Sequence, residues 1–344
     1  MLNYKEYLSE LEKIDVFHFE RFLKDKKILI TGATGLIGSA LIDELIYLNQ
    51  RCDLNLYVYA AGRNYQKFKQ RFEYWKDEKA LQFVYYDAME PIAFEDVFDF
   101  IVHGASNANP RSYSLQPVET MISNFIGAKN LLDYLKENVH GKLLLISSSE
   151  VYGKSNSSKP YSETDYGYVD ISNPRACYPI AKRAAETLCA TYKKEYGVDY
   201  VTVRPGHVYG PTMTLIDNRA ASEFLREARK GKNIVMKSAG VQLRSYCYVV
   251  DCVSAILTVL LKGESGEAYN ISNPDSVVTI RDFAECTAKE AGVKVVFENV
   301  TDVEKASYNL MDNSSLTSDK LEGLGWEGKF DLENGVQATL RALH

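Results

Sequence analysis

The sequence is poor in the residues that build metal centres and disulfide frameworks. Its six cysteines form no C-x-x-C pair, and its five histidines are scattered along 344 residues. Metal sites and disulfide scaffolds both need such side chains at short, repeated spacings. We therefore expect no metal site, and reduced cysteines of the kind found in cytoplasmic proteins.

Positive charge and long apolar runs are also scarce. The formal net charge of −6 argues against nucleic acid as the main partner. The longest apolar stretch, Tyr246 to Leu261, is too short to cross a bilayer and contains Asp251. The charged residues before Lys27 do not resemble a secretory leader. The sequence thus predicts a cytoplasmic protein with neither a nucleic-acid nor a membrane partner.

A glycine-punctuated turn is the first feature with chemical meaning. The apolar run Lys27 to Thr31 leads into Gly32-x-x-Gly35-x-x-Gly38, and apolar residues then recur at helical spacing as far as Leu45. A glycine turn lets the backbone approach a diphosphate, and the following helix presents unpaired N–H groups to it. This pattern predicts a dinucleotide site, although glycine turns also occur for steric reasons alone.

Further apolar runs alternate with helical patterns along the first two thirds of the chain. Such alternation is typical of an α/β fold with a doubly wound parallel sheet, a Rossmann-like fold, in which ligands lie at the carboxyl ends of the strands. The predicted strands are 27–31, 54–60, 81–86, 100–104, 142–147 and 200–204.

The expected domain organisation has three parts. Residues 1–25 form an N-terminal helical extension, and 26–205 form the NAD(P)-binding Rossmann domain, to which 246–262 returns. Residues 206–245 and 263–344 form a smaller mixed α/β lobe that binds substrate.

The end of the second strand bears on coenzyme choice. A NAD-selective site usually has an acidic residue here that binds the ribose 2′-hydroxyl, whereas this chain has Arg63. Arg63 can pair with the 2′-phosphate of NADP, be solvated, or stack on adenine in a NAD site. Asp87, after the third strand, is placed to contact adenine. NAD and NADP therefore both remain open, and a redox-neutral enzyme would hold its coenzyme tightly.

Tyr178 and Lys182 are four residues apart, so both lie on one face of a helix. A nearby ammonium and a positive nicotinamide ring favour the phenolate and thereby make tyrosine a usable base. Ser148, at the end of a neighbouring strand, can hold a substrate hydroxyl by a hydrogen bond. Together these residues predict removal of a hydroxyl proton as hydride leaves the same carbon.

These motifs resemble the extended short-chain dehydrogenase/reductases, that is, the NAD-dependent epimerase/dehydratase family that acts on nucleotide sugars. The resemblance rests on TGATGLIG (31–38), HGA (103–105), Asn124, SSSEVYG (147–153), YPIAK (178–182), RPGHVYGP (204–211) and Arg244. It implies a nucleotide-diphosphate sugar substrate whose C4 hydroxyl is oxidised. It also implies a homodimer formed by the helix 120–136 and the helix that carries Tyr178.

The resemblance assigns residues to three roles. The catalytic residues would be Ser148, Tyr178, Lys182 and Glu150. The coenzyme would be bound by Gly32, Thr34, Gly35, Leu36, Ile37, Gly38, Arg63, Asp87, Ala88, Gly104, Ala105, Ser106, Asn124, Tyr178, Lys182, Pro205, His207 and Val208. The substrate would be bound by Ser149, Arg175, His207, Arg219 and Arg244.

The residues after Ser148 discriminate between reactions of this family. Its 4,6-dehydratases have an Asp-Glu pair here, and Ser149 replaces the aspartate that protonates the departing hydroxyl. Simple 4-epimerases usually lack an acidic residue at the position of Glu150. The sequence is most similar to UDP-glucuronate decarboxylases, in which the 4-ketone permits loss of CO₂ and Glu150 would lie near C5. Alternatively, Glu150 is a strand-end carboxylate that pairs with a neighbour.

Three departures leave other functions open. The family segment R-x-F-N-x-x-G-P-R reads RPGHVYGPT at 204–212, so His207 either replaces an asparagine as a diphosphate donor or is structural. The segment 307–313 lacks the arginine expected there, and Arg63 replaces the usual acid. The favoured function is a redox-neutral decarboxylase or epimerase that returns the hydride to the sugar. An NADPH-dependent reductase of a 4-keto nucleotide sugar is the alternative, and a non-catalytic dinucleotide sensor is the third possibility.

Overall fold

The computed structural model describes residues 2–14, 19–106, 110–138, 140–298 and 311–343. Its central element is a seven-stranded sheet in the order β10-β6-β5-β4-β1-β2-β3, in which every neighbouring pair is parallel. The strands are β1 (Lys27–Thr31), β2 (Tyr57–Gly62), β3 (Leu81–Tyr85), β4 (Phe100–His103), β5 (Lys142–Ile146), β6 (Asp199–Pro205) and β10 (Ala268–Ile271). The expected α/β, Rossmann-like fold is thereby confirmed.

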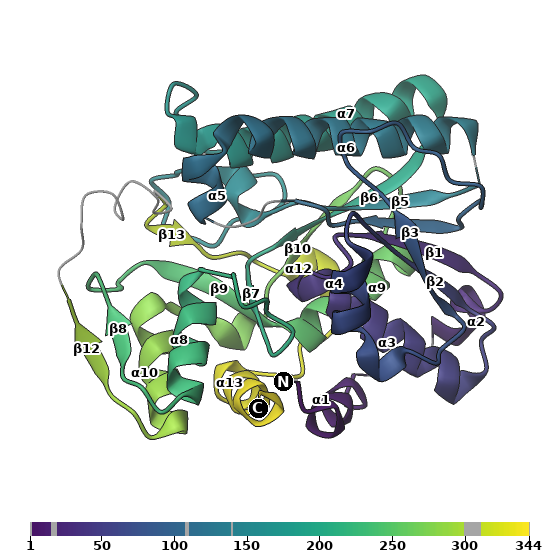
Figure 1. Ribbon diagram of the computed structural model, residues 1–344. Helices are drawn as coiled ribbons and strands as arrows, with labels where there is room; N and C mark the ends of the chain where they lie inside the picture. Colours follow the sequence, from purple (N-terminus) through teal and green to yellow (C-terminus); the bar gives the residue numbers. More distant parts are fainter. Residues whose placement is uncertain (1, 15–18, 107–109, 139, 299–310, 344) are drawn as a thin grey trace.

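Helices cover both faces of this sheet, as Figure 1 shows. The long helices α6 (Pro117–Glu137) and α7 (Cys177–Tyr196) pack against each other on one face, and α3 (Leu36–Cys52) and α9 (Val249–Lys262) pack on the other. Side chains alternate accordingly along β1, because Ile28 and Ile30 join the core beside α3 and Leu29 joins the core beside α6. The strands are therefore apolar on both faces.

A smaller lobe lies beyond the carboxyl ends of these strands. Its main sheet joins β9 (Leu243–Tyr248) to β7 (His207–Tyr209), β11 (Val277–Thr279) and β13 (Asn313–Ser314). A second pair is formed by β8 (Ile234–Met236) and β12 (Val295–Phe297). The lobe also contains α8 (Ala220–Arg229), α10 (Ile280–Ala291) and α13 (Leu332–Ala342), whereas α12 (Asp319–Glu322) packs against β10 of the large sheet.

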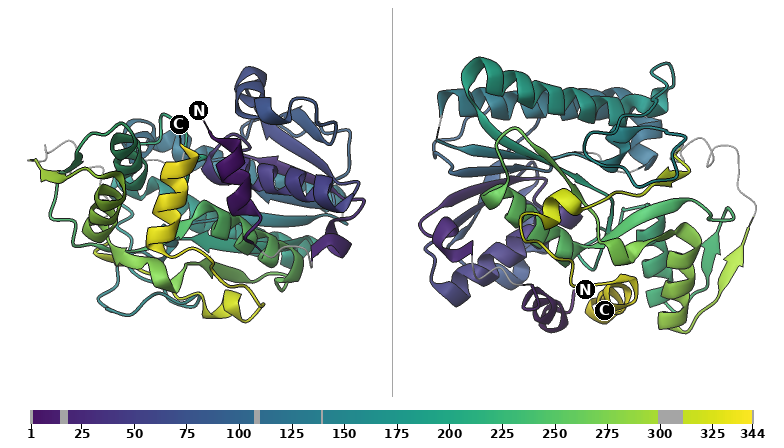
Figure 2. Two further views of the ribbon diagram at one scale, coloured as in Figure 1. Left: turned by 90° about the horizontal axis from the view of Figure 1, so that it is seen from below. Right: turned by 180° about the vertical axis from the view of Figure 1, so that it is seen from behind.

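The N-terminal extension packs on the body of the protein. The Asn3 N–H donates to the Ala342 carbonyl at 2.8 Å, and α1 (Tyr4–Leu11) lies against α13 with the two termini close together (Figure 2). Glu10 of α1 accepts a hydrogen bond from Arg341 of α13 at 3.2 Å. A short helix, α2 (Glu20–Leu23), precedes β1.

Several boundaries differ from those expected. The chain between β4 and α6 contains a short helix, α5 (Pro110–Leu115), that was not predicted from the sequence. Because β10 lies at the edge of the large sheet, part of 263–344 does not belong to the lobe. Within 246–262, α9 packs on the large sheet while β9 belongs to the smaller one. Among the described residues, no helix is both long and apolar enough to cross a membrane.

Candidate active site

The glycine turn after β1 forms a cradle made of backbone. Gly32 has φ +72, and a Cβ added to it would lie 2.6 Å from the backbone carbon of Gly104. Helix α3 begins after Gly35 without a side chain that caps its first N–H groups. These groups and the positive end of the helix dipole therefore face the space above the turn, where they suit an anion such as a diphosphate.

We predict that Gly32→Ala destabilises the fold and abolishes dinucleotide binding. Positive φ costs a non-glycine residue about 1–3 kcal/mol, and the added methyl group would also collide with the Gly104 backbone. Gly197→Ala is the matched control, because Gly197 has φ +75 with no atom within 4 Å of an added Cβ. Urea unfolding and coenzyme titration of both variants test this. Equal effects of the two substitutions on coenzyme binding would show that the turn at Gly32 has no particular role in binding the dinucleotide.

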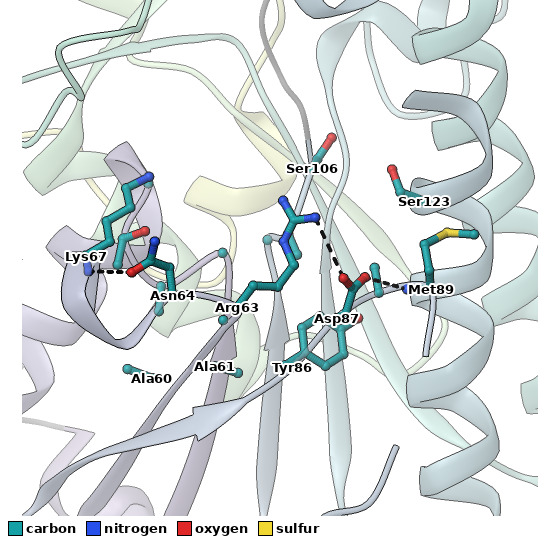
Figure 3. A pocket seen from close by; sticks show the side chains of 18 of the residues that line it. Ala60, Ala61, Arg63, Asn64, Lys67, Tyr86, Asp87, Met89, Ser106 and Ser123 are labelled. Atoms are coloured by element: carbon teal, nitrogen blue, oxygen red, sulfur yellow. Dashed lines mark hydrogen bonds and ion pairs between the residues drawn. The ribbon is translucent and has the colours of Figure 1, made fainter. Parts of the chain in front are cut away.

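A cavity of about 590 Å³ opens beside the glycine turn, between the ends of β1, β2, β3 and β4. Figure 3 shows Arg63 and Asp87 directed toward each other across it, with 3.7 Å between Arg63 Nη1 and Asp87 Oδ2. Of the predicted coenzyme residues, this cavity is lined by Gly32, Thr34, Gly35, Arg63, Asp87, Ala88, Gly104, Ala105 and Ser106.

A second cavity of about 350 Å³ lies between the sheet and the smaller lobe. It shares Gly32, Gly35, Lys67, Gly104 and Ser106 with the first, so that the two adjoin over the glycine turn. The predicted residues that line it are Leu36, Ile37, Gly38, Ser148, Ser149, Glu150, Tyr178, Lys182, Pro205, His207, Val208 and Arg219. Residues from segments far apart in sequence thus meet at the carboxyl ends of the strands.

Tyr178 is buried and neutral in this environment. Its ring stacks on Tyr113 with 4.6 Å between the ring centroids. Burial, followed by the charge of Glu150, raises the pKa of Tyr178 to about 12, although a hydrogen bond with Ser148 lowers it. The phenolate expected from the sequence therefore needs a further positive charge, and the predicted source is the nicotinamide ring.

Lys182 is held beneath Tyr178 by the sheet. Its ammonium donates to the Ile146 carbonyl at 2.9 Å and lies 5.9 Å from the Tyr178 ring centroid. Burial lowers the pKa of Lys182 to about 8, against the opposing charge of Glu186. Glu186 in turn accepts hydrogen bonds from Ser147 and Arg204, so the carboxylate nearest Lys182 is itself fixed.

Glu150 forms a paired contact with Arg175. The two guanidinium nitrogens donate to the two carboxylate oxygens at 3.0 and 3.1 Å, and the arginine lies over the Tyr113 ring at 4.6 Å. The Arg175 and Glu150 side chains are 9% and 18% exposed. This two-point contact fixes the carboxylate at the edge of the second cavity.

Two further arginines and a histidine lie on the lobe side. Arg219 pairs with Asp217 at 2.6 Å, and Arg244 is buried and donates only to backbone carbonyls in the described contacts. Burial, followed by Arg244 and Arg219, lowers the pKa of His207 to about 3. His207 is therefore neutral, and its Nδ1 is buried with no partner among the described residues.

Three predicted residues line neither cavity. These are Arg175, Arg244 and Asn124, and the last is buried in α6, where its amide donates to the Thr120 carbonyl at 2.7 Å. Of the motif segment 307–313, residues 307–310 lie outside the described residues.

Several lining residues were not predicted from the sequence, among them Asn64, Lys67, Tyr113, Ser123, Thr214 and Asp217. Only Lys67 carried a usable signal, since it is a cation four residues after Arg63. Within the described part of the chain, no group of three or more histidine, cysteine or acidic side chains is placed to hold a metal ion.

A comparison of the sequence with models of protein families shows the family to which the chain belongs. The model described as "NAD dependent epimerase/dehydratase family" matches residues 28–272. The chain belongs to this family. Its resemblance to that family, expected from the motifs, is therefore confirmed.

The chain is also similar to curated decarboxylases. It is 34% identical to UDP-glucuronic acid decarboxylase 6 of Arabidopsis thaliana, over 92% of this chain and 88% of the relative. It is 32% identical to UDP-glucuronic acid decarboxylase 1 of Xenopus tropicalis, over 93% of this chain and 73% of the relative.

Solved structures share the fold at lower identity. A dTDP-glucose 4,6-dehydratase from Streptomyces venezuelae, solved with NAD, has a TM-score of 0.78 at 22% identity and covers 92% of this chain and 96% of its own. A UDP-glucuronic acid 4-epimerase from Bacillus cereus, solved with UDP-glucuronic acid and NAD, has a TM-score of 0.75 at 22% identity. It covers 92% of this chain and 98% of its own.

Proposed function

We propose that the protein oxidises the C4 hydroxyl of a nucleotide sugar, decarboxylates a UDP-glucuronate-like substrate, and ends with its coenzyme unchanged. The observation that carries this proposal is that Glu150 lines the second cavity together with Tyr178 and Ser148 and is held there by its two hydrogen bonds with Arg175. The similarity to decarboxylases over nine tenths of the chain supports it.

The cavities fit an extended dinucleotide. The backbone cradle at Gly32 and the uncapped start of α3 suit the diphosphate, with the adenosine toward Arg63 and Asp87. Tyr178 and Lys182 would then flank the nicotinamide end. A dinucleotide held there would supply the hydride acceptor for oxidation at the sugar C4 and the hydride for the final reduction.

Tyr178 is the proposed base for the C4 hydroxyl. Ser148 holds that hydroxyl by a hydrogen bond, and the ammonium of Lys182 stabilises the phenolate once the proton has moved. Because the sheet fixes Lys182 through the Ile146 carbonyl, this charge needs no rearrangement during the step.

Decarboxylation then follows from the substrate's own chemistry. A ketone at C4 makes the C5 carboxylate a β-keto acid, so the electron pair left when the C5–carboxylate bond breaks delocalises into the ketone as CO₂ departs. The resulting enolate is protonated at C5, and the C4 carbonyl is reduced back to a hydroxyl. Arg175 holds Glu150 at the cavity edge, where it would assist the step at C5 through water or by direct contact.

We predict that Glu150→Gln preserves coenzyme reduction but slows CO₂ release by about 10²-fold or more, as expected when a proton-transfer group is lost. Stopped-flow absorbance of the nicotinamide and trapping of CO₂ separate these two half-reactions. The control is Glu150→Gln combined with Arg175→Gln, which removes the buried charge left by the single substitution. Equal slowing of both half-reactions in both variants would make Glu150 structural.

The specific observation that favours a second candidate is Arg63. In an NADPH-dependent reductase of a 4-keto nucleotide sugar, Tyr178 would donate a proton to the C4 carbonyl oxygen, and the ammonium of Lys182 would stabilise the phenolate that remains. The reductase would consume NADPH with each turnover, whereas the decarboxylase would not. Because the tyrosine and lysine of the catalytic motif are both present in the cavity, a non-catalytic sensor is the least supported candidate.

A homodimer through α6 and α7 is part of the proposal and rests on the family resemblance. Of the exposed apolar side chains on α6, Val118 and Ile122 line the first cavity, whereas Met121 lines neither cavity. Light scattering of the purified protein measures its mass in solution.

A further inference from the structure

We infer that the adenosine end of the coenzyme cavity binds a 2′-phosphate, so that the protein prefers NADP(H) to NAD(H). The inference rests on the proposed function, in which the protein binds a dinucleotide, and it specifies that this dinucleotide carries a 2′-phosphate. It concerns Arg63 and Lys67, which flank the first cavity beyond β2 and at the start of the following helix, α4 (Tyr65–Arg71).

The end of β2 lacks the acid that a ribose 2′-hydroxyl needs. In an open α/β sheet the residue after the second strand reaches the adenosine ribose, and a carboxylate there accepts from the hydroxyl. Here β2 ends at Gly62, and the next two side chains that line the cavity are a guanidinium and an amide, those of Arg63 and Asn64. A carboxylate at this point would repel a phosphate, whereas Arg63 is suited to bind one with two parallel hydrogen bonds.

Arg63 has hydrogen-bonding capacity to spare. Its side chain is 71% exposed, and its distance of 3.7 Å from Asp87 exceeds that of a hydrogen bond. Figure 3 shows the guanidinium turned toward Asp87. Asp87 is held by its own turn, since Oδ1 accepts from the Met89 N–H at 3.0 Å. The carboxylate therefore positions the guanidinium without occupying all of its donors.

Lys67 adds a second cation on the same side. The Asn64 side chain caps α4 by accepting from the Lys67 N–H at 2.9 Å, so Lys67 lies in the first turn of the helix. Lys67 lines both cavities (labelled in Figure 3) and forms no ion pair among the described residues. Two cations thus line the first cavity beyond β2, where a 2′-phosphate would supply an anionic partner that NAD lacks.

Asp87 offers the competing arrangement. If its carboxylate bound the ribose hydroxyls from the end of β3, Arg63 would stack on adenine and the site would favour NAD. The two arrangements predict different responses to Arg63→Ala. Loss of a 2′-phosphate contact weakens binding only of ligands that carry a 2′-phosphate, namely NADPH and 2′,5′-ADP. Loss of a stacking contact weakens binding of every ligand that contains adenine.

The test is equilibrium binding to the full chain after removal of any bound dinucleotide. Isothermal titration with NADPH, NADH, 2′,5′-ADP and 5′-AMP gives the affinity of each ligand without turnover. We expect NADPH to bind about 10- to 100-fold more tightly than NADH, as a charge-assisted contact allows. We expect 2′,5′-ADP to bind more tightly than 5′-AMP by a similar factor.

Three variants complete the test. We expect Arg63→Ala to bring NADPH affinity close to that of NADH and to leave NADH affinity unchanged, and Lys67→Ala to have a smaller effect in the same direction. Lys69→Ala is the matched control, because Lys69 is an exposed lysine of the same helix that does not line the cavity. Circular dichroism confirms folding, which these exposed positions should not disturb.

Two results would overturn the inference. Tighter binding of NADH than of NADPH by the wild type is one, and an equal loss of both ligands in Arg63→Ala is the other. In either case the proposed function stands, because a dinucleotide still binds. Absence of binding by every dinucleotide would instead refute the proposed function.

Discussion

Replacing Tyr178 by phenylalanine is expected to lower turnover by about 10²- to 10⁴-fold, the range for loss of a positioned acid–base group. The ring would keep its stacking contact with Tyr113. The Lys182 ammonium would keep its bond to the Ile146 carbonyl. Only the proton acceptor is removed, so coenzyme affinity should change little.

Tyr196→Phe is the control for this substitution. Tyr196 lies on the same helix, α7, is 40% exposed and lines neither cavity. It should retain full turnover. Titration measures coenzyme binding and product analysis measures turnover, so an effect on catalysis can be distinguished from an effect on binding. Unchanged turnover in Tyr178→Phe would remove the proposed mechanism, and loss of coenzyme binding would assign Tyr178 to binding instead.

Glu44→Gln is expected to raise the stability of the protein at pH 8 by several kcal/mol relative to wild type. Glu44 lies in α3 with 1% exposure, and its Oε2 has no partner among the described residues. Burial, and to a lesser extent Asp43, raises the pKa of Glu44 to about 8, whereas Arg51 lowers it. The carboxyl is therefore protonated in the native protein at neutral pH.

The sign of the pH dependence follows from this shift. Between about pH 4.5 and pH 8 the native state holds a proton that the unfolded state has released, so stability falls as pH rises through this interval. The loss is on the order of 4 kcal/mol for one proton, because one pKa unit corresponds to about 1.4 kcal/mol. Glutamine resembles the protonated form and does not titrate, so the variant should lack this loss.

Urea unfolding at pH 5 and pH 8 measures the difference directly. We expect the wild type and Glu44→Gln to be similar in stability at pH 5 and the variant to be more stable at pH 8. Glu73→Gln is the control, since the Glu73 side chain is 68% exposed and its loss should leave the pH dependence unaltered. A constant difference between Glu44→Gln and wild type at the two pH values would contradict a buried neutral carboxyl.

The sequence sufficed to predict six of the seven strands of the main sheet and its glycine turn. Lys27–Thr31 and Lys142–Ile146 are short runs that are apolar on both faces, a pattern typical of buried parallel strands. The edge strand β10 was missed because its four residues carry no such run. Helix α5 was missed because Pro110 and Ser112 are typical of loops, although proline is well tolerated in the first turn of a helix.

The sequence predicted many of the residues that form the candidate site but not the contacts between them. Spacing placed Tyr178 and Lys182 on one helix face, yet only the tertiary fold shows Lys182 bonded to the Ile146 carbonyl. The Glu150–Arg175 pair joins the two ends of a long polar segment, and no local pattern signals such a contact. Tyr113, which stacks on Tyr178, belongs to a segment that shows no periodicity.

The most direct test of the proposed decarboxylation is incubation with UDP-glucuronate in the presence of coenzyme equal to the enzyme in amount. If the coenzyme is restored in every cycle, many molecules of CO₂ should form per enzyme, and the coenzyme should end in the redox state in which it began. If instead no CO₂ forms, and a 4-keto nucleotide sugar consumes one NADPH per turnover, the enzyme is a reductase and not a decarboxylase.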